Sequence, residues 1–120
     1  MIRILPFDDD RVVALHVDGK TTAEDLTPVL STIEKKLAVH DRLRIYLELH
    51  DFGGLSADAL LGDLKAAVKH WNRFEREAIV TDTAWAQKVA SAAGRLVPGL
   101  DIRSFAFNER DAARSWIRDA

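Results

Sequence analysis

The segment from residue 43 to residue 71 constrains the fold most strongly, because its hydrophobic pattern changes from that of a strand to that of a helix. Apolar and polar residues alternate over 43–50, as expected for a strand with one buried face. A turn with two adjacent glycines follows, and Ser56 is placed to cap a helix that continues to Trp71. A central strand covered on both faces would be apolar throughout. The segment therefore predicts a sheet with one exposed face, which carries His16, Arg44, Tyr46 and Glu48.

The rest of the chain alternates between strand and helix patterns. Two short apolar runs separated by Pro6 and three aspartates predict a β-hairpin. Thr21 and Thr22, each with an acidic residue three positions later, predict a helix start. Pro28 predicts a kink or a short first turn in that helix. We expect strands at 2–5, 12–18, 43–50, 77–81 and 102–107, and helices from 21 or 22 to about 40, from 56 to 71, from 82 or 83 to about 94, and from 108 to 117.

The order of these elements predicts their arrangement. Connections between parallel strands are right-handed in nearly all proteins. If the strands lie side by side in chain order, this handedness places every helix on the same side of the sheet. We therefore expect an α/β fold with a five-stranded mixed sheet, in which the first strand is antiparallel in a hairpin, the others are parallel, and four helices cover one face. The chain has 120 residues, which predicts a single domain over 1–120.

The composition excludes several classes of function. The chain has no cysteine, so disulfides and thiolate metal sites are excluded. A formal net charge of −2 provides no general attraction for nucleic acid, and we expect no nucleic-acid partner. No apolar run approaches the roughly 18 residues of a membrane-spanning helix, and no secretory signal is visible. These features predict a cytoplasmic protein.

Four segments of the chain resemble the SpoIIAA-like proteins, a branch of the STAS domains. They are VVALHVDGKTTAEDL, LRIYLELHDFGG, KHWNRFEREAIVTDTAW and LVPG, and FEREAIVTDTAW is the most specific part. The resemblance implies a five-stranded sheet with four helices on one face and a non-enzymatic role in protein interaction or ligand binding. It also implies that the protein associates with membranes and holds an apolar ligand between movable helices.

The predicted ligand site lies around the second and third helices. Gly53 and Gly54 could let backbone N–H groups approach an anion, but the lysine of a P-loop is missing. They favour a flexible turn, which can act as a hinge for the second helix. We expect a small apolar or amphipathic ligand, or a protein partner, and no cofactor. The four histidines lack the local spacing of metal ligands, so we expect no bound metal. The predicted ligand-binding residues are Phe52, Gly53, Gly54, Leu61, Leu64 and Trp85.

Three cationic residues lie along the second predicted helix and just beyond its end. Lys65, Lys69 and Arg73 recur every four residues and therefore share one helix face. Such a face can contact an anionic membrane surface or an acidic partner. The alternative is an ordinary solvated face.

The sequence also allows two other functions, a phosphorylation switch and a weak hydrolase, and it allows a homodimer. Ser56 can serve as a phosphorylation site like that of the anti-sigma-factor antagonists, or as a plain helix cap. The Asp-Ser step of those proteins is absent here, which weakens the first interpretation. His50 and Asp51 end a strand, where ligands of α/β proteins gather, and can act as the acid and base of a weak hydrolase. The exposed sheet face can pair with a second copy in a homodimer.

Overall fold

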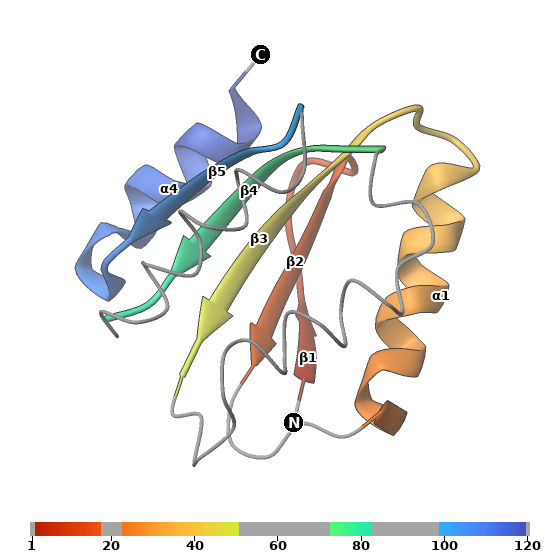
Figure 1. Cartoon of the computed structure of the whole chain (residues 1–120), viewed down its shortest axis with the longest axis horizontal. Coiled ribbons are helices and arrows are strands. Elements are labelled where there is room, and N and C mark those ends of the chain that lie inside the picture. The colour runs from red at the N-terminus through yellow and green to blue at the C-terminus, as the bar shows by residue number, and fades with distance from the viewer. Residues whose placement is uncertain (1, 18–22, 51–72, 83–98, 120) are drawn as a thin grey trace.

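A five-stranded mixed sheet is the main element of the computed structural model, which describes residues 2–17, 23–50, 73–82 and 99–119 (Figure 1). The strands lie side by side in chain order, as expected. The first pair is antiparallel and the remaining pairs are parallel, which confirms the predicted topology. The helices predicted over 56–71 and from 82 or 83 to 94 lie outside the described residues. The strands are β1 Ile2–Leu5, β2 Val12–Val17, β3 Leu43–Leu49, β4 Phe74–Val80 and β5 Asp101–Phe105.

One face of the sheet packs against helix α1, Leu26–Leu37, which follows the 3-10 turn η1, Ala23–Asp25. Pro28 is the third residue of α1, where a missing backbone N–H removes no hydrogen bond within the helix. The preceding 3-10 turn agrees with the predicted short first turn. The apolar side of β3 contributes to the same core, which buries the residues Leu43, Ile45, Leu47 and Leu49 together with Leu26, Val29, Ile33 and Leu37.

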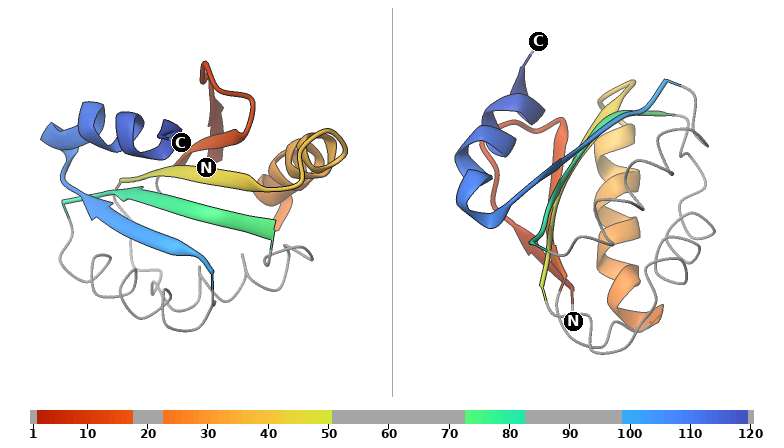
Figure 2. Two further views of the ribbon diagram at one scale, coloured as in Figure 1. Left: turned by 90° about the horizontal axis from the view of Figure 1, so that it is seen from above. Right: turned by 60° about the vertical axis from the view of Figure 1, so that its left-hand side comes forward.

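The opposite face packs against the last helix, α4, Arg110–Arg118, which follows the 3-10 turn η3, Phe107–Glu109 (Figure 2). Ala113 and Ile117 of α4 are fully buried against Tyr46, which is 0% exposed. The prediction of four helices on one face is therefore wrong. The handedness rule applies to a helix that connects two parallel strands. Because α4 follows the last strand, that rule does not determine its side of the sheet.

Two arginines attach the end of α4 to this face. Arg44 on β3 donates from Nη1 to the carbonyl oxygen of Ile117, 2.8 Å away, and to that of Asp119. Arg76 on β4 donates to the same Asp119 oxygen at 3.0 Å. The last carbonyls of a helix lack partners in the helix and carry partial negative charge, so guanidinium groups stabilise them. Arg44 is only 4% exposed and also forms an ion pair with Glu75, with Nε and Oε1 2.8 Å apart.

The prediction that the polar side of β3 faces solvent is wrong for the same reason. Arg44, Tyr46 and Glu48 are all buried. Their polar groups are paired with other groups of the chain, which lowers the cost of removing them from water. The alternation correctly separated the two faces of the strand but did not show that a helix covers the second one.

Candidate functional site

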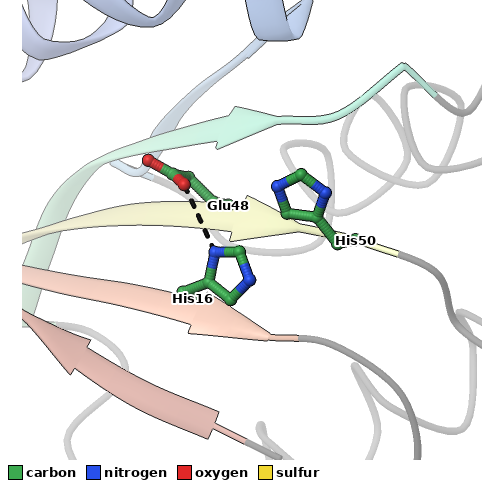
Figure 3. Close-up of side chains that lie close together, drawn as sticks. All are labelled: His16, Glu48 and His50. Atoms are coloured by element: carbon green, nitrogen blue, oxygen red, sulfur yellow. Dashed lines mark hydrogen bonds and ion pairs between the residues drawn. The ribbon is translucent and has the colours of Figure 1, made fainter.

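Three side chains with metal-ligating or acid–base chemistry meet at the carboxyl edge of β2 and β3: His16, Glu48 and His50 (Figure 3). His16 lies in β2 and pairs in register with Glu48 in β3. His50 directly follows β3, two residues after Glu48, so the alternation of a strand places both on the same face. One nitrogen or oxygen atom from each residue lies within 4.8 Å of the other two. Regular strands thus hold the first two side chains side by side.

Hydrogen bonds fix the position of the Glu48 carboxylate. Tyr46 donates its hydroxyl to Oε2 of Glu48 over 2.7 Å, while Nδ1 of His16 lies 3.3 Å from Oε1 and forms a hydrogen bond with it. The side chains of His16 and Glu48 are 12% and 10% exposed. Tyr46 is fully buried under α4, so its hydroxyl has little freedom to move away. The carboxylate is therefore oriented from the protein interior, and its second oxygen faces His16.

The protonation states of this group follow from its surroundings. Burial acts to raise the pKa of Glu48, but the hydrogen bonds from Tyr46 and His16 and the charge of Arg110 together lower that pKa below its usual range. Burial, and next the hydrogen bond to Glu48, raise the pKa of Tyr46 to about 12. At neutral pH the edge therefore presents an ionised carboxylate and a protonated phenol.

The ring of His50 lies between two other rings, tilted against one and stacked on the other. Its centroid is 4.6 Å from that of His16, with 31° between the planes, and 4.1 Å from that of Phe107, with 15° between the planes. Phe107 belongs to η3, and its backbone N–H donates to Oδ1 of Asp82 over 3.0 Å. The guanidinium of Arg110 lies 5.3 Å from the Phe107 ring centroid. The edge therefore combines flat apolar surfaces with charged groups, as binding sites for small molecules commonly do.

Most of the residues predicted from sequence to form a site lie outside the described residues, so those assignments stay predictions. This holds for the predicted ligand-binding residues, for the predicted phosphorylation site, for the aspartate paired with His50 in the hydrolase hypothesis, and for two of the three predicted surface cations. They are Asp51, Phe52, Gly53, Gly54, Ser56, Leu61, Leu64, Lys65, Lys69 and Trp85.

Arg73, the third predicted surface cation, has a structural contact that the sequence did not indicate. Its guanidinium donates to the carbonyl oxygens of Leu37, His40 and Asp41 at 3.1, 2.9 and 2.9 Å. It thus caps the C-terminal end of α1, as Arg44 and Arg76 cap that of α4. Within the described part of the chain, no helix has the length and apolar character needed to cross a membrane.

The sequence indicates His50 as a candidate and His16 and Glu48 as residues of one sheet face, but it does not show that the three side chains meet. The spacing patterns of metal ligands lie within one segment, whereas His16 is 32 residues from Glu48. The register of β2 and β3 makes His16 and Glu48 direct neighbours. The sequence contains a usable signal. His16 and Glu48 each lie one residue before the end of a parallel strand, since β2 ends at Val17 and β3 ends at Leu49.

Comparison with known proteins places the chain in a family. The family model described as SpoIIAA-like matches residues 12–118. The crystal structure of an uncharacterized protein from Shewanella loihica with a SpoIIAA-like fold is 27% identical, with a TM-score of 0.69, and the match covers 98% of this chain and 92% of that one. No curated protein matches the sequence. The fold and the family match support a regulatory or binding module of the STAS type, and the chain belongs to the SpoIIAA-like family.

Proposed function

We propose that this chain is a non-enzymatic binding module that holds a small amphipathic ligand at the carboxyl edge of its sheet. The observation that carries the proposal is the convergence of His16, Glu48 and His50 beside the ring of Phe107. In open α/β sheets, ligands bind outside the carboxyl ends of the strands. The chain continues from His50 through Asp51 to Phe52, Gly53 and Gly54, the first of the ligand-binding residues predicted from sequence.

The chemistry of the described edge favours binding over catalysis. Covalent catalysis needs a nucleophile activated by a neighbouring base. Tyr46 supplies the hydroxyl that is hydrogen-bonded to Glu48, but a pKa of about 12 keeps this hydroxyl protonated, and it donates a hydrogen bond to a carboxylate with a lowered pKa. Aromatic faces and charged groups lie side by side at this edge, which suits a molecule with an apolar part and a polar end.

Native mass spectrometry of the freshly purified chain tests the proposal. The wild-type protein is expected to carry an additional small-molecule mass that is lost on denaturation. His50→Ala removes a ring of the stack and is expected to lose that mass. His40→Ala is the matched control, because His40 precedes β3 at the other end of the strand and pairs with Asp10, with 2.7 Å between Nε2 and Oδ2.

Two results would contradict the proposal: a wild-type protein without any additional mass, or a His50→Ala variant that retains it in full. A mass corresponding to a polypeptide would replace the small molecule with a protein partner as the occupant. A comparison of hydrolysis rates for wild type and His50→Ala over a broad set of ester and phosphoester substrates addresses the enzyme alternative. Equal rates are expected, and a loss of turnover in the variant would favour the hydrolase.

A further inference from the structure

We propose that His16, Glu48 and His50 bind a divalent transition-metal ion of the zinc class. This inference names the chemistry of the same edge and so rests on the proposed binding role. The residues offer two imidazoles and one carboxylate, a donor set that suits zinc and related ions. Magnesium and calcium prefer oxygen donors alone and fit this set poorly.

The distances agree with a common metal position for the first two donors. Two donors that are each roughly 2.0–2.2 Å from a tetrahedral zinc ion lie about 3.4 Å from one another. Nδ1 of His16 and Oε1 of Glu48 are 3.3 Å apart. Because paired residues of neighbouring parallel strands carry these atoms, the backbone already sets their separation. The ion can replace the direct contact between the two groups without a change in the sheet.

The third donor requires a rotation of one side chain. The three donor atoms lie within 4.8 Å of one another. This limit is about 1.4 Å greater than the separation of roughly 3.4 Å between two donors of one tetrahedral zinc ion. His50 follows the last residue of β3, and its ring is stacked on Phe107 and tilted against His16. Turning the ring about its side-chain bonds brings a nitrogen towards Oε1 of Glu48. We therefore expect metal binding to break the present stack of the His50 ring on Phe107.

The surroundings of Glu48 are those of a metal ligand. Tyr46 donates to Oε2, which leaves Oε1 on the side of His16 and fixes the carboxylate plane. Partners of this kind orient metal ligands, and their removal typically lowers metal affinity by about 10- to 100-fold. Three protein donors leave a fourth position open, which a polar group of the proposed ligand can occupy.

Calorimetric titration of metal-free protein with zinc chloride tests the inference, and His50→Phe is the central variant. Phenylalanine keeps an aromatic ring between His16 and Phe107 but has no nitrogen donor. Wild type is expected to bind one zinc ion per chain, and His50→Phe to bind it at least about 100-fold more weakly. His40→Phe is the matched control, because it also breaks a contact between a histidine and a carboxylate, and is expected to bind zinc as wild type does.

Two further measurements make the result decisive. Glu48→Gln, which keeps an oxygen acceptor for Tyr46, is a second variant and is expected to weaken zinc binding as well. Cobalt(II) added to wild type should produce the visible absorption of a low-symmetry nitrogen and oxygen site, and this absorption should be absent in His50→Phe. Circular dichroism compares the fold of all variants. Equal zinc affinity of wild type and a folded His50→Phe, or an equal loss in His40→Phe, would overturn the inference.

The metal inference and the proposed function can fail separately. If zinc binds at this edge but no organic molecule accompanies the purified protein, the metal site stands and the proposed small-molecule ligand is wrong. If an organic molecule is bound in a manner that depends on His50 while zinc chloride produces no heat in wild type, the metal site is wrong and the binding role stands.

Discussion

The buried carboxyl group of Glu77 on β4 predicts that the stability of this protein falls as the pH rises towards neutrality. Glu77 is only 3% exposed. It pairs in register with Ile45 on β3 and Ile102 on β5, so it points into the apolar face shared with α1. Among the described residues, neither a cation nor a hydrogen-bond donor contacts its carboxylate. Burial raises the pKa of Glu77 from 4.5 to about 7.

The sign and size of the effect follow from proton linkage. Between pH 4.5 and about 7 the folded protein keeps a proton on Glu77 that the unfolded chain releases. The folded state therefore binds more protons, and its stability decreases with rising pH in this interval. The contribution is full below 4.5 and entirely lost above 7. Each pKa unit corresponds to about 1.4 kcal/mol, so the total is about 3 kcal/mol, most of which is lost between roughly pH 5 and 8.5.

Urea unfolding of wild type and Glu77→Gln at a series of pH values measures this effect. The glutamine side chain has nearly the same shape and does not titrate, so the other groups of the protein cancel in the comparison. We expect the free energy of unfolding of wild type, relative to the variant, to fall by about 2–3 kcal/mol from roughly pH 5 to pH 8.5. Parallel curves for the two proteins would refute the reasoning, since Glu77 would then have the same pKa in the folded and unfolded states.

Three further substitutions test the polar contacts of the two sheet faces. Arg44→Met removes the guanidinium that caps α4, and we expect the free energy of unfolding to fall by about 2 kcal/mol. Urea titration measures this loss, and an unchanged value would contradict the capping role of Arg44. Tyr46→Phe leaves Oε2 of Glu48 without its donor and should raise the pKa of Glu48, and NMR titration that finds this pKa unchanged would contradict the assignment. Arg73→Met should lower stability by about 1 kcal/mol and accelerate amide hydrogen exchange in the last turn of α1, whereas wild-type exchange there would exclude the cap.

The sequence predicted the sheet well because alternation and turns are local signals. The strand expected at 43–50 is observed over Leu43–Leu49, and the hairpin strands and their antiparallel pairing are confirmed. The strand expected at 77–81 begins three residues earlier, at Phe74. Charged residues at 75–77 obscured this start, since Glu75 pairs with a buried arginine and Glu77 is itself buried, and neither condition is visible locally.

The covering of the second face depends on contacts between distant parts of the chain. Arg44 looks like a solvent-facing residue within its own strand, yet its hydrogen-bond acceptor Ile117 is 73 residues away. A charged side chain can be buried when such partners exist, and a single sequence does not reveal them. The candidate site could not be read from the sequence for the same reason, because His16 and Glu48 become neighbours only through the register of β2 and β3. Local spacing finds only those metal ligands that share a segment.

The nitrogen resonances of the histidine rings provide the most direct test of the carboxyl edge as the functional site. Long-range proton–nitrogen NMR spectra recorded with and without one equivalent of zinc chloride report each imidazole separately. We expect that the ring nitrogen resonances of His16 and His50 shift together on coordination, while those of His40 at the opposite end of β3 stay in place. Unchanged His16 and His50 resonances, or an equal response of His40, would contradict it.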